Sequence, residues 1–171
     1  ATLLLRARLL NQLERTEEAL PLLRNALKNH PDDTRLRMTY ARLLIELNRL
    51  EEARAEFLEL LQQSPNDDDL RFSLALINMD LNAWQEAQVY LEELLLRGSH
   101  LNAAYFHLGR VLEELDDIPN SLDAYKAVEP SESYLAAQQR IIYLLLTQKN
   151  RSEDTTHFDT QRIEHPNLAI Q

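Results

Sequence analysis

Small residues recur along the chain at intervals of 34, and this spacing constrains the fold more than any other feature of the sequence. Two such columns are present, Ala7, Ala41, Ala75 and Gly109 in one and Ala19, Ala53, Ala87 and Ser121 in the other. Two helices that cross closely need a small side chain at the point where their backbones approach. The sequence therefore predicts a row of helical hairpins, with one small residue on each helix of a hairpin.

The composition of the chain and the positions of its prolines and aspartates agree with this interpretation. The chain has only two glycines and six prolines in 171 residues, which favours helices over sheets and predicts an all-α fold. A large apolar residue follows each member of the second column by one helical turn, namely Leu23, Phe57, Leu91 and Tyr125. Pro31 and Pro65 are placed to end the second helix of their hairpins, and Asp33 and Asp67 to cap the helices that follow. The expected hairpins span about 1–31, 32–65, 66–99, 100–129 and, less regularly, 131–166.

The pattern resembles that of the tetratricopeptide repeat (TPR) family. Tyr105, Leu108-Gly109, Ser121 and Tyr125 match it in the fourth unit, and Ala53, Phe57 and Pro65 match its second half in the second unit. The resemblance implies a right-handed α-solenoid of antiparallel hairpins, with about four regular repeats and one irregular one. We expect residues 1–171 to form a single domain that is part of a longer array.

In an array of this kind, the first helix of each hairpin lines a concave groove that can hold a partner segment. The residues predicted on that face are Arg8, Met38, Arg42, Ile45, Phe72, Leu76, Met79, Phe106 and Arg110. Most of these side chains are apolar, which predicts an apolar or amphipathic partner segment whose carboxylates meet the arginines. The alternative is that neighbouring helices pack on the apolar members as ordinary core.

Charge and residue types exclude several functions. The 18 basic against 28 acidic residues give a net charge of −10, which disfavours a nucleic-acid partner. No apolar run is long enough to span a membrane. The five histidines have no metal-ligand spacing, and no phosphate-binding loop or catalytic constellation is present. We therefore expect a protein that is not an enzyme and needs no cofactor or metal.

Three short runs give a finer resemblance. Asp69–Leu76, Tyr90–Leu94 and Arg97–Leu101 are similar to outer-membrane TPR lipoproteins of Gram-negative bacteria that act as adaptors for periplasmic C-terminal-processing proteases. This resemblance implies a periplasmic or membrane-anchored location rather than a cytoplasmic one, and a role in bringing a protease to its substrates. The alternatives are an assembly scaffold in pilus, secretion or polysaccharide-export machinery, a docking arm of a larger enzyme, and self-association through the ends of the array.

Overall fold

The computed structural model describes the backbone of residues 2–164 and the side chains of residues 3–149. Over this range the chain is all-α, with no strand among the described residues. The helices in chain order are α1 (Thr2–Gln12), α2 (Thr16–Asn29), α3 (Thr34–Glu46), α4 (Leu50–Gln63), α5 (Asp68–Asp80), α6 (Trp84–Leu96), α7 (Leu101–Glu114), α8 (Ile118–Lys126) and α9 (Tyr134–Glu164).

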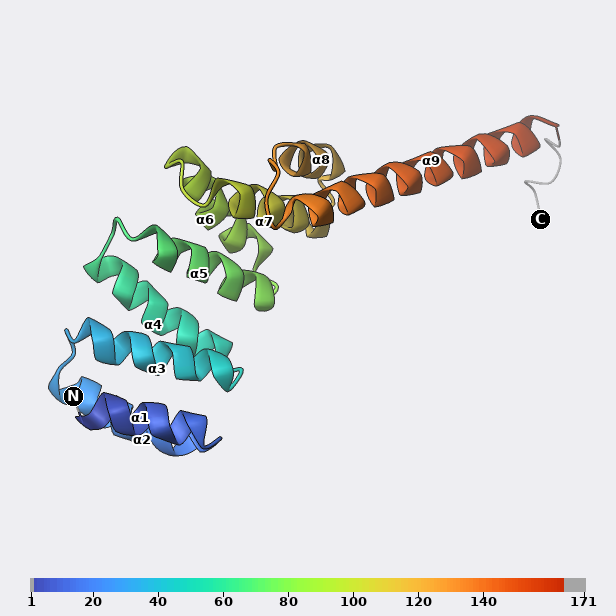
Figure 1. The fold of residues 1–171 in the computed structure, drawn as a ribbon. Helices are drawn as coiled ribbons and strands as arrows, with labels where there is room; N and C mark the ends of the chain where they lie inside the picture. Colours follow the sequence, from blue (N-terminus) through green and yellow to red (C-terminus); the bar gives the residue numbers. More distant parts are fainter. Residues whose placement is uncertain (1, 165–171) are drawn as a thin grey trace. The chain divides into compact units, whose positions relative to one another are not determined.

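The helices form two compact units. The N-terminal unit covers Ala1–Ala104, and the C-terminal unit covers Tyr105–Gln171. In the N-terminal unit each helix packs on the next one in sequence, and α1 also contacts α3. Figure 1 shows α3 beside α1, and α4 between α3 and α5. In the C-terminal unit α8 packs on α9.

The two columns of small residues are buried, as the sequence predicts. Ala7, Ala41, Ala75, Ala19, Ala53, Ala87 and Ser121 are all 0% exposed, and Gly109 is also buried. The four large residues of the second helices are buried as well, from 0% exposure for Leu23, Leu91 and Tyr125 to 3% for Phe57. The 34-residue period therefore marks the core of each hairpin.

The helix boundaries follow the predicted signals. Asp33 caps α3, because its carboxylate accepts hydrogen bonds of 3.0 Å from the backbone N–H groups of Arg35 and Leu36. Asp67 caps α5 in the same way, through the N–H of Leu70. The helices α2 and α4 end two residues before Pro31 and Pro65. Proline thus separates the hairpins, and aspartate starts the next one.

A second periodic feature lies in the turns inside the hairpins. The turn residues have φ between 55° and 59°, in the left-handed region, and they are Glu14, Asn48, Asn82 and Asp116, again 34 apart. Each is followed by a residue whose N–H donates a 2.8 Å hydrogen bond back to a carbonyl in the last turn of the helix, as Arg15 does to Leu10. This is the Schellman arrangement, and it favours glycine or asparagine at the left-handed position. Glutamate is the poorest fit of the four.

Replacing Glu14 with asparagine should raise the free energy of unfolding by about 0.5–1 kcal/mol, because asparagine tolerates the left-handed conformation better than glutamate. Glu14 forms no ion pair with another described side chain, so the change removes no contact of that kind. Urea denaturation followed by circular dichroism measures the difference. Glu14→Ala lacks the short polar side chain with which asparagine forms local hydrogen bonds in the left-handed conformation, so it should bring no gain. An equal gain from both changes would contradict this explanation.

The C-terminal end of the fold differs from the sequence-based prediction. Residues 131–166 were expected to form a fifth hairpin, with a turn between about residues 148 and 152. The structure has instead a single helix, α9, from Tyr134 to Glu164. The physical reason is that residues 148–152 contain neither glycine nor proline, so nothing in this stretch stops a helix.

Candidate interaction groove

The N-terminal unit has a hollow on the face formed by its odd-numbered helices. Its volume is about 570 Å³. Side chains from α1 and α3 form most of the wall, and the end of α4 and the start of α5 close it. The lining residues are Leu4, Leu5, Arg8, Thr34, Arg35, Met38, Thr39, Leu60, Ser64, Asp67 and Leu70. We call this hollow the α1–α3 groove.

Helical spacing explains the wall contributed by α3. Arg35, Met38, Thr39 and Arg42 lie at positions i, i+3, i+4 and i+7, which places them on one face of the helix. The opposite face of α3 carries the buried residues Leu36, Leu43 and Leu44. Of the residues predicted to contact a partner, Arg8 and Met38 line the groove, while Arg42 and Ile45 are exposed farther along α3. Leu5 and Arg35 are additional lining residues that the sequence analysis did not select.

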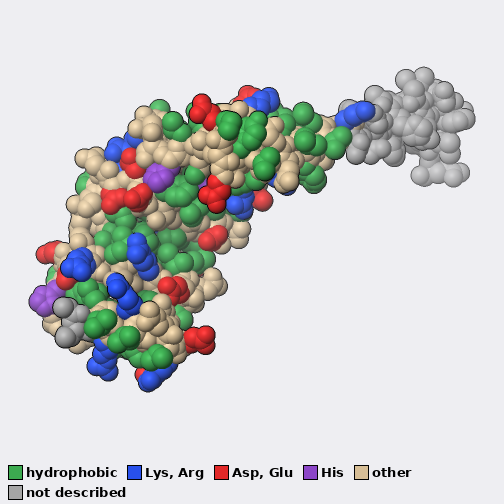
Figure 2. Space-filling model, in the orientation of Figure 1, with side chains coloured by type: hydrophobic (Ala, Val, Ile, Leu, Met, Phe, Trp, Pro, Cys, Tyr) green, Lys and Arg blue, Asp and Glu red, His purple; other side chains and the backbone are tan. Residues whose placement is uncertain are grey.

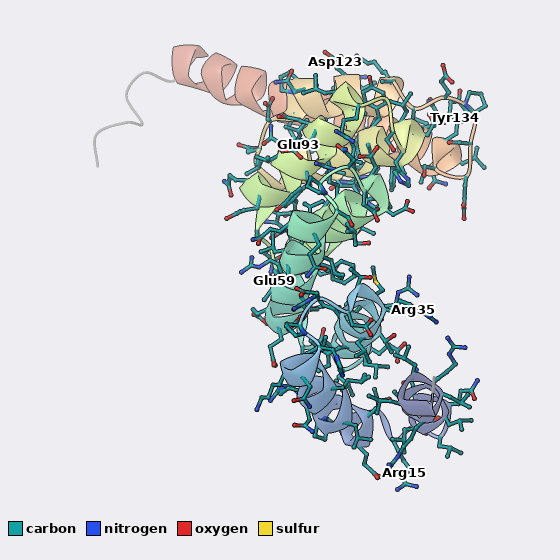
Figure 3. The ribbon with its side chains drawn as sticks, turned by 90° about the vertical axis from the view of Figure 1, so that its left-hand side faces the viewer. Arg15, Arg35, Glu59, Glu93, Asp123 and Tyr134 are labelled. Atoms are coloured by element: carbon teal, nitrogen blue, oxygen red, sulfur yellow. The ribbon has the colours of Figure 1, made fainter. Side chains whose placement is uncertain are left out.

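Charge is unevenly distributed over the N-terminal unit. Two arginines and no acidic residue lie on α1, and α3 carries three arginines and one glutamate. In contrast, α4 carries four glutamates and one arginine, and α6 carries three glutamates and no basic residue. Figure 2 shows Lys and Arg side chains standing among hydrophobic ones in the part of this unit that contains α1 and α3. In Figure 3, Arg35 and Glu59 of α4 point to opposite sides of the ribbon.

The arginines of the groove face lack acidic partners. Arg8, Arg35 and Arg42 form no ion pair with any described side chain. Arg37, on another face of α3, contrasts with them. Its guanidinium donates to the Glu56 carboxylate at 2.5 Å and to the Pro31 carbonyl at 2.8 Å. Arg37 therefore ties α3 to α4 and to the loop that precedes α3, while the groove arginines remain available to an incoming carboxylate.

Arg71 repeats the structural role of Arg37 one period later. It donates to Glu93 at 3.1 Å and also to the carbonyl of Pro65. Both arginines are largely buried, with 12% or 13% of the side chain exposed. The sequence analysis did not identify them, although their 34-residue separation is a signal that could have done so.

The predicted groove residues of α5 are less accessible than expected. Phe72 is half-buried, and its ring stacks on the imidazole of His100 with centroids 5.0 Å apart. The His100 Nε2 lies 2.9 Å from the Asp69 carboxylate, so the stacked ring is also held at its edge. Leu76 is half-buried. Met79 is only 6% exposed and belongs to the core, which corrects its assignment to the groove surface.

The remaining two predicted residues lie in the C-terminal unit. Phe106 and Arg110 border a separate hollow of about 390 Å³ between α7 and α9, together with Glu113, Glu114, Ala136, Gln139 and Arg140. Phe106 also packs at an angle against Tyr125, with ring centroids 5.9 Å apart, so it is partly core. The alternative interpretation of an apolar stripe as core is thus correct for part of the predicted set.

A charged network lies beside this second hollow. The Tyr125 hydroxyl donates to the Glu113 carboxylate at 2.5 Å, and Arg140 pairs with the same carboxylate, Nε at 3.0 Å from Oε1. Burial and the hydrogen bond to Glu113 raise the pKa of Tyr125 above its ordinary value. The hydrogen bond to Glu113 raises the pKa of Arg140. Glu113 and Arg140 satisfy each other, and the two other charged residues that border this hollow, Arg110 and Glu114, have opposite signs, so the hollow has no excess of positive charge.

The described part of the chain shows no group of side chains arranged to hold a metal ion. Within the same residues, no helix is long and apolar enough to cross a membrane.

Comparison with known proteins identifies the repeats. Residues 10–63, which include α2, α3 and α4, match a family model described as tetratricopeptide repeat. Over all 171 residues the chain is 62% identical to the TPR repeat-containing protein PA4667 of Pseudomonas aeruginosa. The chain therefore contains tetratricopeptide repeats. It spans 29% of the length of that TPR relative.

Solved structures agree with the TPR fold. A tetratricopeptide repeat protein from Parabacteroides merdae superposes with a TM-score of 0.73 at 14% identity, over 97% of this chain and 66% of that one. MamA from Desulfovibrio magneticus, residues 41 to the end, superposes with a TM-score of 0.74 at 16% identity, over 99% of this chain and 96% of that one. At these identities the likeness concerns the fold alone. TPR arrays are generally non-catalytic scaffolds that bind proteins, so the fold implies protein partners.

Proposed function

We propose that this chain is a non-catalytic scaffold that holds a segment of a partner protein in the α1–α3 groove. One observation carries the proposal: Arg8 and Arg35 stand without ion pairs beside exposed or half-buried apolar side chains, including Leu5 and Met38, in a hollow of about 570 Å³. Apolar contact supplies affinity, and fixed charges select the partner and its orientation. The repeats provide a preformed wall, so the scaffold loses little conformational entropy when the segment binds.

The finer proposal is an adaptor that links a periplasmic C-terminal-processing protease to its substrates, in an outer-membrane-anchored protein. Its support is the resemblance of the Asp69–Leu76, Tyr90–Leu94 and Arg97–Leu101 runs to such adaptors. The similar protein from Pseudomonas aeruginosa, a Gram-negative organism, is compatible with it. In this role the chain supplies a binding surface, and the protease supplies the catalytic residues.

Self-association is a second candidate, which a different surface favours. On α9, Leu135, Ile142 and Leu146 are 73%, 58% and 57% exposed, which is unusual for large apolar side chains of one helix. Covering these side chains with a second copy would remove apolar surface from water. An assembly scaffold in pilus, secretion or polysaccharide-export machinery and a docking arm of a larger enzyme also remain alternatives; neither has an observation of its own in the structure.

Photo-cross-linking tests the groove directly. A benzophenone amino acid replaces Met38 in the groove or, as the matched control, Val89, which is 53% exposed on α6. Both variants are introduced into the full-length protein in Gram-negative cells, and cross-linked peptides are identified by mass spectrometry. We expect position 38 to cross-link a defined segment of a partner protein and position 89 not to do so.

The identity of the cross-linked protein separates the candidates. A processing protease or its substrate supports the adaptor, secretion or pilus components support the assembly scaffold, and a second copy of the chain supports self-association. Cross-links from position 89 alone would overturn the groove proposal and place the binding surface on the even-numbered helices.

A further inference from the structure

We propose that the α1–α3 groove is selective for acidic segments in which an apolar side chain stands between two carboxylates. This inference rests on the proposed function and specifies the chemistry of the partner. It begins from the contrast between the whole chain and the groove. The chain carries a net charge of −10, yet α1 and α3 together carry one acidic residue and their groove arginines are unpaired.

Most other arginines of the described region are already neutralised. Arg15 pairs with Glu18, Arg49 with Glu52 and Arg97 with Asp68. Six of the thirteen arginines with described side chains form no ion pair, namely Arg6, Arg8, Arg35, Arg42, Arg54 and Arg110. Two of the six, Arg8 and Arg35, line one hollow, and Arg42 follows on the same face of α3. Their positive charge is therefore concentrated where a partner can reach it.

The order of side chains along α3 sets the pattern of the ligand. Arg35 and Arg42 are two helical turns apart, about 10 Å, and Met38 lies between them on the same face. In an extended segment, alternate side chains point to the same side and residues i and i+4 are separated by about 13 Å. The flexible reach of arginine covers the difference. An extended Glu-x-Leu-x-Glu segment can therefore pair its two carboxylates with arginines and place its leucine against Met38.

The surroundings of the groove restrict where such a segment lies. Asp67 is the one acidic residue that lines the groove, and its carboxylate already caps α5. Asp68 and Asp69 follow it at the start of the same helix; Asp68 is paired with Arg71 and Arg97, whereas the Asp69 side chain is 87% exposed. The exposed carboxylate of Asp69 repels an acidic segment that crosses onto α5, so the segment is expected to run along α1 and α3. The glutamates of α4 and α6 repel the same segment from the opposite face, which adds selectivity.

The inference is tested with labelled peptides and fluorescence anisotropy on the intact chain. The acidic probe contains Glu-Ser-Leu-Ser-Glu, and the neutral probe contains Gln-Ser-Leu-Ser-Gln. We expect the acidic probe to bind about tenfold more tightly than the neutral one at low salt, and this preference to shrink at 0.5 M salt. Arg35→Gln/Arg42→Gln, which removes the two arginines on either side of Met38, should remove the preference. Lys28→Gln/Lys126→Gln, which loses the same charge outside the groove, should keep it.

The outcomes distinguish this inference from the proposed function. If both probes bind equally to the wild-type chain and Met38→Glu abolishes both, the groove binds segments but the preference for acids is wrong. If Met38→Glu, folded by circular dichroism, binds the acidic probe as the wild type does, the site itself is elsewhere. Loss of the preference in the Lys28→Gln/Lys126→Gln control would show an effect of overall charge and would also overturn the inference.

Discussion

Replacing Gly109 with alanine should lower the free energy of unfolding by about 2 kcal/mol, although alanine occupies the same position in the three preceding repeats. A β-carbon at Gly109 would lie 2.7–2.8 Å from three ring carbons of Tyr125, well inside contact distance. Tyr125 is fully buried and its hydroxyl is held by Glu113, so the ring cannot easily move. Overpacking of this kind typically costs about 1–3 kcal/mol and outweighs the gain of alanine in a helix. Urea denaturation monitored by circular dichroism measures the loss.

The matched control is Tyr125→Leu, which makes the fourth repeat resemble the first and third, where Leu23 and Leu91 fill the position. Tyr125→Leu alone leaves a cavity beside Gly109 and should be destabilising. The double variant Gly109→Ala/Tyr125→Leu should be less destabilised than the sum of the two changes, because the new methyl group occupies part of that cavity. Strictly additive losses would contradict the coupling.

The repeat core could be predicted well from the sequence because only a small side chain fits where two helices cross closely. Ala7, Ala41 and Ala75 are fully buried, and the residue types at these positions are small wherever the period places them. The coupling of Gly109 to Tyr125 was not predictable from spacing, since Ala41 accommodates the equally aromatic Phe57 in the second repeat. What differs is the hydroxyl anchor on Glu113, which is a tertiary contact.

The candidate groove was predicted less completely. A single helical offset selects one row of side chains, which includes Arg8 and Met38 but omits Leu5 and Arg35, each about one helical turn away. The same offset also selected Met79, which is buried. Whether an apolar side chain at such an offset is surface or core depends on the neighbours that cover it, as His100 covers one face of Phe72. Sequence periodicity does not contain that information.

Replacing Glu113 with alanine should lower the free energy of unfolding by about 2 kcal/mol. The carboxylate is 12% exposed and receives hydrogen bonds from two residues, the hydroxyl of Tyr125 and the guanidinium of Arg140. Its loss leaves a buried tyrosine hydroxyl without this acceptor, which costs more than the net value of the bond. Arg140 is 41% exposed and can recover solvation, so the cost stays below that of breaking a fully buried ion pair.

The comparison with Tyr125→Phe separates the two contributions. Tyr125→Phe removes the hydroxyl that Glu113→Ala leaves without its acceptor. If that hydroxyl accounts for much of the cost, the loss of unfolding free energy in Glu113→Ala/Tyr125→Phe should be about 1 kcal/mol smaller than the sum of the losses in the two single variants. The coupling is measured by urea denaturation of all four proteins. A double variant whose loss equals the sum would show that Glu113 acts mainly through Arg140. Arg140→Ala would then have to reproduce the loss seen in Glu113→Ala, since both changes break the same pair between α7 and α9.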